Sequence, residues 1–229
     1  MCTRYISPED REIEAFWHIG RRERKLPQRP LNIYPLSVGP FIRRVRDEVA
    51  YAREWVEGQW GLIPPCSLTK TPTNTQGRRL STVNARSEEV AAKPTYRDAW
   101  KRGQRCIIPA ASFDEPNWET GKNEWWRFRR ADGAPWGLAG LWNVWTDKAT
   151  GEVCESYTML TINADAHPLM NRMHKPDPKL PADAQDKRSV IPIEHGDVDQ
   201  WLAGTIVEAN ELLKLSPVEL FAAAPATTS

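Results

Sequence analysis

Six short apolar segments, separated by turn signals, constrain the fold of this chain more than any other feature. They comprise residues 41–45, 55–63, 106–108, 125–129, 136–145 and 153–162. Their length and their apolar content are typical of strands, and tight turns are predicted at residues 131–133 and 147–151. Four prolines between residues 27 and 40 exclude a helix there. The pattern therefore predicts a mostly antiparallel sheet.

Helical signals lie at the ends of the chain and between the strands. Short helices are predicted within residues 9–24, ending near Gly20, and at residues 95–103, 197–203 and 206–215. No internal repeat or clear linker divides the chain, so we expect one α+β domain with a barrel-like sheet core and peripheral helices. This domain is expected to span residues 1–221, followed by a flexible C-terminal tail at residues 222–229.

Composition excludes several classes of protein. A mean hydropathy of −0.59 with 27% charged residues is typical of a soluble globular chain. No apolar run approaches the ~20 residues that span a bilayer, and the first residues form no secretory signal, so we expect a cytoplasmic protein. The four cysteines have no zinc spacing, and the usual nucleotide and metalloenzyme motifs are absent. We therefore expect no cofactor and no metal, and we expect a monomer.

The first two residues, Met1 and Cys2, carry the most specific chemistry. A small second residue permits removal of Met1, which would leave an α-amine and a thiol on adjacent carbons of Cys2. The reference pKa values of ~8 and ~8.5 leave the amine partly neutral and the thiol partly ionised at neutral pH. An aldehyde would then form an imine with the amine, and the thiolate would close a thiazolidine ring. The alternative is that Cys2 is an incidental second residue.

Three further places carry candidate site residues. Arg86 could bind a phosphate with two hydrogen bonds, and Asn84 could bind a sugar or the Cys2 backbone. The alternative is that this segment is a turn at the end of a strand, followed by a helix cap. The carboxyl group of Glu115 follows a buried strand, where a raised pKa would suit acid or base catalysis, although a surface turn is the alternative. His174 lies between Arg and Lys and could transfer a proton near pH 7, with His167 as its competitor.

Basic and aromatic residues are the last candidates for binding. Eight Arg and Lys residues lie between Arg21 and Arg46 against one acid, Glu23. Such a segment could meet phosphates or could form a solvated face. The chain has 11 Trp, which are either core residues or rings that stack on a ligand or a nucleobase.

Eight sequence blocks occur in order along nearly the whole chain. They are MCTRY (1–5), NIYP (32–35), WGLIP (60–64), NARSE (84–88), RCIIPA (105–110) with Glu115, LAGLW (138–142), YTMLT (157–161) and RMH (172–174). Together they resemble the SRAP family, the SOS response-associated peptidases or abasic site processing proteins. The resemblance implies a protein that recognises abasic sites in single-stranded DNA and joins its N-terminal Cys to the sugar aldehyde as a thiazolidine.

The resemblance also implies roles for individual residues. Cys2 would be the nucleophile, Asn84 would support it, Glu115 would assist the imine chemistry and its reversal, and His174 would help to open the sugar ring. The residues that match DNA-contacting positions are Arg4, Asn32, Trp60, Arg86, Thr158 and Arg172. Removal of Met1, by the protein itself or by another enzyme, would account for the word peptidase.

Departures from the family pattern concern the surroundings of these residues. Thr3 stands where Gly is common, and Pro116 follows Glu115 where the family often has Trp. The family often has His two residues before the Arg-Met pair, where this chain has Met170, and here His174 follows the pair instead. We expect a short loop shift to bring the His174 ring to the same place.

Two other functions remain compatible with the sequence. The first is an N-terminal-nucleophile peptidase or amidase that acts in trans with Cys2 as nucleophile and His174 as base. The second is a non-catalytic binder of single-stranded nucleic acid that uses the basic segment and Trp60.

Overall fold

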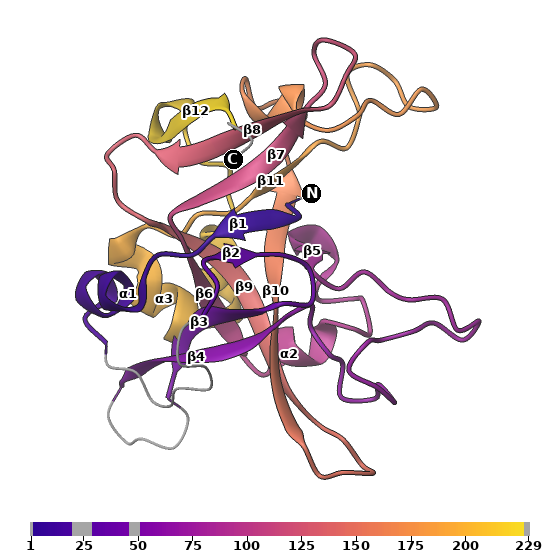
Figure 1. Ribbon diagram of the computed structural model, residues 1–229, viewed down its shortest axis with the longest axis vertical. Coiled ribbons are helices and arrows are strands. Elements are labelled where there is room, and N and C mark those ends of the chain that lie inside the picture. The colour runs from indigo at the N-terminus through magenta and orange to yellow at the C-terminus, as the bar shows by residue number, and fades with distance from the viewer. Residues whose placement is uncertain (1, 20–28, 46–50, 227–229) are drawn as a thin grey trace.

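The computed structural model describes residues 2–19, 29–45 and 51–226 (Figure 1). One sheet closes into a five-stranded barrel, because β10 pairs with both β4 and β9. The barrel strands, in order around the ring, are β10 (Val153–Asn163), β4 (Arg53–Trp60), β3 (Val38–Arg44), β6 (Arg105–Ala110) and β9 (Trp136–Thr146). Strands β5 (Asn84–Arg86) and β11 (Arg188–Val190) also pair with β10. Only the pairings of β10 with β4 and β5 are parallel among the described strands, so the expected mostly antiparallel, barrel-like core is confirmed.

A second sheet lies beside the barrel and is antiparallel throughout. Its order is β12 (Phe221–Pro225), β8 (Glu124–Arg130), β7 (Ser112–Asn117), β1 (Arg4–Ile6) and β2 (Asn32–Ile33). The chain passes from the barrel to this sheet at Ala111, between β6 and β7. This sheet brings the start of the chain alongside residues more than one hundred positions later (Figure 1).

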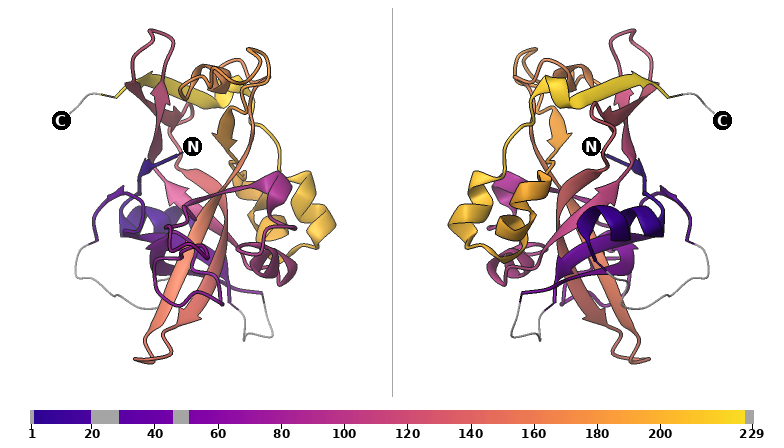
Figure 2. Two further views of the ribbon diagram at one scale, coloured as in Figure 1. Left: turned by 90° about the vertical axis from the view of Figure 1, so that its right-hand side faces the viewer. Right: turned by 90° about the vertical axis from the view of Figure 1, so that its left-hand side faces the viewer.

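The α-helices lie against the outside of the barrel (Figure 2). The α-helices are α1 (Asp10–Trp17), α2 (Arg97–Lys101), α3 (Val198–Ala203) and α4 (Ile206–Glu211), and the 3-10 helices are η1 (Ser87–Glu89), η2 (Met170–Arg172), η3 (His195–Asp197) and η4 (Val218–Leu220). Helix α1 ends earlier than expected because His18 adopts a left-handed backbone with φ of 53°. Residues 20–24 of the predicted helix lie outside the described residues.

The C-terminal end differs from the expected flexible tail. Residues 221–225 form strand β12, which pairs with β8 over five residues. Phe221 anchors this strand, because its ring lies 5.2 Å from that of Trp136 and 6.3 Å from that of Phe128. The small alanines that suggested a tail therefore pair with an edge of the second sheet, and residues 227–229 lie outside the described residues.

Tryptophan is mainly a core residue in this protein. Five Trp side chains are fully buried, namely Trp17, Trp55, Trp60, Trp136 and Trp201. They belong to two clusters of buried apolar residues, one toward the helices and one between the barrel and the second sheet. Cys2 lies in the second cluster, so the start of the chain is part of the packed interior.

Candidate active site

Two strands position Cys2 at one end of the second sheet. Strand β1 pairs with β7, with Arg4 opposite Asp114, so the residues before Arg4 run toward the end of β7. The Cys2 side chain is buried, and its thiol donates a hydrogen bond to the Arg4 carbonyl at 3.3 Å. The Cys2 carbonyl accepts a hydrogen bond from Asn84 Nδ2 at 2.7 Å. Of the two partners that the sequence suggested for Asn84, the structure shows the Cys2 backbone.

The ionisation of Cys2 is governed by its burial. Burial raises the pKa of the Cys2 thiol well above its ordinary value, and the negative charge of Glu115 raises it further. The thiol is therefore neutral at pH 7 in the chain that still carries Met1, whereas the expected partial ionisation concerned Cys2 after Met1 has been removed. The physical reason is that a thiolate loses its hydration in an apolar cluster. A nearby proton acceptor is then needed before the sulfur can attack.

Strand β7 carries the paired carboxylates and buries both. Asp114 and Glu115 are each 1% exposed, which excludes the surface turn. Because side chains alternate along a strand, the two carboxyl groups point to opposite faces of the sheet. Asp114 accepts two hydrogen bonds from Arg127, at 2.8 and 3.0 Å. Glu115 instead lies 2.8 Å from His174 Nε2.

Glu115 is held in its charged form. Burial alone would raise the pKa of this carboxyl group, as the sequence predicted, but positive charge nearby outweighs burial and lowers the pKa below its ordinary value. The positive charge of the N-terminal amine is the largest cause of this lowering, and His174 contributes next through its charge and its hydrogen bond. A buried carboxylate that stays ionised is suited to accept a proton from a neutral thiol.

The position of His174 depends on backbone contacts. It follows η2 and has a left-handed backbone with φ of 64°, which is uncommon for a residue with a side chain. Its N–H donates to the Pro116 carbonyl at 2.6 Å. The buried Lys187 Nζ donates to the carbonyls of Met173 and His174, at 2.7 and 2.6 Å. These contacts hold the imidazole beside Glu115.

Met170 and His167 have other roles. Met170, two residues before Arg172, is fully buried in the apolar cluster that contains Cys2, and His174 is the residue that contacts Glu115. Nδ1 of His167 accepts hydrogen bonds from the N–H groups of Leu169 and Met170, at 3.1 and 3.0 Å. Its Nε2 therefore carries the proton and donates to the Ser216 carbonyl at 2.9 Å. His167 is a buried structural residue that joins η2 to the C-terminal segment.

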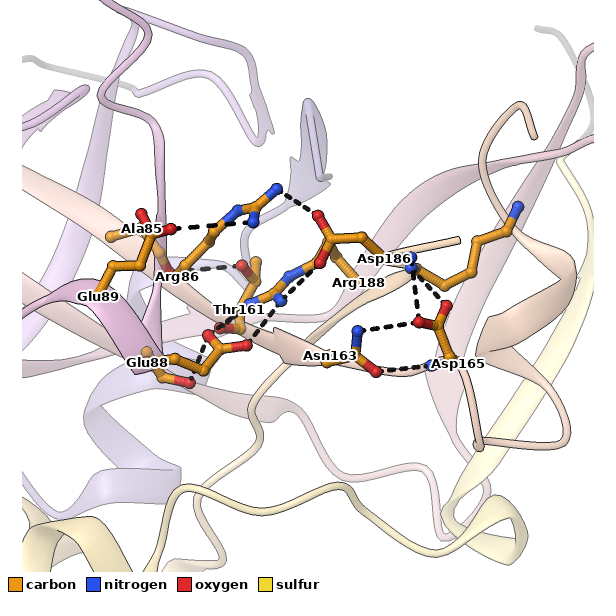
Figure 3. Close-up of polar contacts among 11 residues, drawn as sticks. Ala85, Arg86, Glu88, Glu89, Thr161, Asn163, Asp165, Asp186 and Arg188 are labelled. Atoms are coloured by element: carbon orange, nitrogen blue, oxygen red, sulfur yellow. Dashed lines mark hydrogen bonds and ion pairs between the residues drawn. The ribbon is translucent and has the colours of Figure 1, made fainter. Parts of the chain in front are cut away.

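An ion-pair network joins β5 and η1 to the segment that includes β11 (Figure 3). Arg86, at the end of β5, binds Asp186. Arg188 of β11 binds the Glu88 carboxylate with two hydrogen bonds of 2.7 Å, and it also contacts Asp186 at 3.1 Å. Asp165 accepts from the Asp186 N–H at 3.0 Å. The network thus links the strand that carries Asn84 to the segment that carries Lys187.

The side chains expected to contact DNA divide into accessible and buried ones. Arg4 is partly exposed and donates to Asn32 Oδ1 at 3.0 Å. Arg86 and Arg172 are also partly exposed, and each is paired with a carboxylate. A DNA phosphate can reach these three cations only by competing with or joining their present partners.

Trp60 and Thr158 correct the expectation, because both are fully buried. Trp60 Nε1 donates to the Val83 carbonyl at 2.8 Å, and the ring packs edge-on against Tyr5, with centroids 5.2 Å apart. Thr158 lies within β10, which has strands on both sides. Neither side chain can touch DNA in this structure. A block that matches a family motif does not reveal which of its residues reach the surface.

The structure describes only part of the basic segment between Arg21 and Arg46. Arg29 and Arg43 are buried and ion-paired, with Asp10 at 2.7 Å and with Glu54 at 2.8 Å. They stabilise the fold and do not form a surface for phosphates. Residues 21–25 and 46, which carry most of the remaining charge, lie outside the described residues.

Sequence reasoning missed two residues near the site. Lys187 had no local signal, because its partners are carbonyls brought together by the fold. Tyr34 belongs to the NIYP block, yet only the structure shows that the residue is 48% exposed and that its ring lies beside Arg4. Within the described ranges, no group of three or more His, Cys, Asp or Glu side chains is placed to hold a metal ion. No helix in the described part of the chain is both long and apolar enough to cross a membrane.

Comparison with known proteins gives a consistent result. A family model described as SOS response associated peptidase (SRAP) matches residues 1–228. The abasic site processing protein HMCES of Xenopus tropicalis is 26% identical over 238 residues, which cover 93% of this chain and 64% of that protein. The abasic site processing protein YobE of Bacillus subtilis is 27% identical over 171 residues, which cover 68% of this chain and 74% of that protein. This chain thus spans less than two thirds of the frog protein's length.

Solved structures share the fold. A crystal structure of a protein from Bordetella bronchiseptica has a TM-score of 0.83 and 35% sequence identity, covering 99% of this chain and 100% of that one. A protein from Bacteroides thetaiotaomicron has a TM-score of 0.74 at 20% identity, covering 99% of this chain and 92% of that one. The second likeness concerns the fold alone.

Proposed function

Because the chain belongs to the SOS response associated peptidase (SRAP) family, we propose that it processes abasic sites in single-stranded DNA and captures them as a covalent thiazolidine on Cys2. The observation that carries this proposal is the convergence of three groups near Cys2. Asn84 holds its carbonyl, the charged Glu115 raises the pKa of its thiol, and His174 lies against Glu115. Single-stranded DNA is favoured because a duplex would hide the sugar carbon from a buried residue.

The reaction follows from the groups present. The ring-closed abasic sugar must open to its aldehyde, and His174 transfers the proton that this step requires. The Cys2 amine then adds to the aldehyde carbon, and loss of water gives an imine. The Cys2 sulfur adds to the imine carbon and its proton passes to Glu115 and then to the ring nitrogen. The net change joins one aldehyde to one N-terminal Cys and releases one water.

The electrostatics of the site support this order of steps. A neutral thiol, with its pKa raised by burial, does not form a persistent thiolate that could react with other electrophiles. The carboxylate of Glu115, with its pKa lowered, remains available as the proton acceptor. While Met1 is attached, the nitrogen of Cys2 is an amide and cannot form the imine. Removal of Met1, by the protein itself or by another enzyme, is therefore part of the proposed activity.

The test uses the purified protein and a single-stranded oligonucleotide with one abasic site. Mass spectrometry first establishes that Met1 is absent. A denaturing gel is then expected to show a slower band with the wild-type protein and none with Cys2→Ala or Cys2→Ser. Both variants keep the α-amine but lack the sulfur, so they can form only reversible adducts, an imine or, with Ser, an oxazolidine. A wild-type protein that lacks Met1 and gives no band, or a Cys2→Ala band of equal yield, would refute the proposal.

Trans-acting amide hydrolysis is tested on the same preparation. The alternative peptidase predicts turnover of peptide substrates that depends on Cys2 and His174. Such an activity would need no abasic DNA, and it would require a peptide bond to reach the buried Cys2 thiol. Turnover of a peptide library without cross-linking to abasic DNA would favour that alternative.

A further inference from the structure

We propose that the ring of Tyr34 stacks on the base of a nucleotide next to the abasic site. This inference rests on the proposed function and adds a binding subsite to it. The sequence assigned a stacking role to Trp60, but that ring is fully buried. Tyr34 is 48% exposed and is therefore available to a ligand.

Strand pairing places Tyr34 beside Arg4, one of the residues that match DNA-contacting positions. Strand β2 pairs with β1 with Ile33 opposite Tyr5, and the same register continued by one residue puts Tyr34 opposite Arg4. The Arg4 guanidinium carbon lies 5.7 Å from the centre of the Tyr34 ring. Arg4 in turn is two residues from Cys2, whose thiol contacts its carbonyl. The exposed ring and the cation thus form one surface along the strand that begins at the nucleophile.

The ring stands on a fixed backbone. The Tyr34 N–H donates to Ser37 Oγ at 2.8 Å, and the Tyr34 carbonyl accepts from the Ser37 N–H at 3.0 Å. Ser37 Oγ also donates to that carbonyl at 2.5 Å. A tyrosine held in this way loses little conformational entropy when a ligand binds, since only the side-chain torsions remain to be ordered.

The chemistry of the surface selects a nucleobase. A single-stranded nucleic acid needs an aromatic face for a base and a nearby cation for the phosphate that follows it. Tyr34 supplies the face, and Arg4 supplies the cation. An abasic nucleotide has no base of its own to stack, so the ring must engage a neighbouring nucleotide. Because every base has a π-face, the subsite is expected to tolerate any base.

The test measures binding without the covalent step. Labelled oligonucleotides carry a tetrahydrofuran residue, an abasic analogue with no aldehyde, flanked by bases on both sides or by a second tetrahydrofuran on the 5′ or the 3′ side. Fluorescence anisotropy is expected to show that Tyr34→Ala weakens binding to the fully flanked oligonucleotide by about 5- to 100-fold. For the oligonucleotide in which a second tetrahydrofuran replaces the stacked base, Tyr34→Ala and the wild type should bind with nearly the same affinity. Tyr34→Phe and Tyr34→Trp should retain binding.

The chain offers a matched control in Tyr51. This residue is 38% exposed and has the Arg44 guanidinium carbon 5.8 Å from its ring centre. Tyr51→Ala should bind all three oligonucleotides as the wild type does. The inference would be overturned if Tyr34→Ala bound all three oligonucleotides as the wild type does, or if it lost affinity for all three equally. Failure of the proposed function would give a different result. The wild-type protein would bind these analogues but would form no cross-link with aldehyde-bearing DNA.

Discussion

Nε2 of His174 lies 2.8 Å from Oε2 of Glu115, and the two residues come from segments 59 positions apart in the chain. This contact joins a partly exposed imidazole to a carboxylate that is 1% exposed. In the proposed reaction, the buried group accepts a proton from the Cys2 thiol, and the more accessible group exchanges protons with the sugar and with solvent. Substitutions at the two residues separate these two roles.

Replacing His174 should slow cross-linking without unfolding the protein. Loss of a general acid or base typically costs 10²- to 10⁴-fold in rate, so we expect His174→Gln to fall about 10²-fold or more below wild type on abasic single-stranded DNA. His167→Gln is the matched control. Because His167 joins backbone groups, its replacement should lower the thermal midpoint and leave the rate of the folded protein near that of wild type. Equal rates for His174→Gln and wild type would contradict the assignment.

Glu115→Gln should slow ring closure and change the dependence of stability on pH. A carboxyl group with a lowered pKa in the folded chain stabilises the fold above its unfolded pKa, and this contribution is lost as the pH falls through its folded pKa. The stability advantage of the wild type over Glu115→Gln should therefore be largest above about pH 4.5 and should shrink below it. Urea unfolding of both proteins between pH 3 and 7, at roughly half-unit intervals, measures the difference. A constant difference across that range would show that Glu115 is not held charged.

Asn84→Ala should make the position of Cys2 less well defined and slow cross-linking. The variant loses the 2.7 Å hydrogen bond to the Cys2 carbonyl, and we expect a loss of about 1 kcal/mol, or roughly 5-fold, in the cross-linking rate. Single-turnover kinetics at saturating DNA measures this rate. Asn84→Asp offers a further comparison, because it has no N–H to donate at neutral pH and should show the same loss. Full activity in Asn84→Asp would contradict the importance of this bond.

Lys187→Met should affect catalysis through His174. The variant leaves the buried carbonyls of Met173 and His174 without their donor, which typically costs about 1–3 kcal/mol of stability. A displaced imidazole should also slow cross-linking, whereas binding of the tetrahydrofuran analogue should be unchanged. In the His174→Gln background, Lys187→Met should have no further effect on the rate. The exposed Lys179 provides the control, and Lys179→Met should match wild type in both assays.

Trp60→Ala should act on stability and not on DNA contact. Truncation of a buried Trp removes a large apolar ring and costs about 3–5 kcal/mol. Trp60→Phe keeps most of the packing, loses the hydrogen bond to Val83 and should retain binding to the tetrahydrofuran analogue. Selective loss of DNA binding in a Trp60→Phe protein with wild-type thermal stability would show that the ring becomes exposed on binding.

Local patterns predicted the five barrel strands and β8, but not the six other described strands, because such patterns depend only on neighbours in the chain. Residues 136–145 and 153–162 are apolar runs around a turn, and they form β9 and β10 with only small changes at their ends. The same reasoning missed β12, whose alanines have little strand propensity and pair only because β8 offers an edge. It also extended α1 too far, since a left-handed residue such as His18 is set by the packing around it.

The sequence by itself predicted the aldehyde chemistry proposed for Cys2, because removal of Met1 would leave an amine and a thiol on adjacent carbons whatever the fold. It also determined which family the chain belongs to, through blocks that occur in order. Tertiary structure alone decided that the thiol is neutral, that Glu115 is charged and that His174 lies beside it. It also decided that Tyr34 is exposed and Trp60 is buried. These properties depend on burial and on charges from distant segments, and only the pairing of strands such as β1 and β7 brings those segments together.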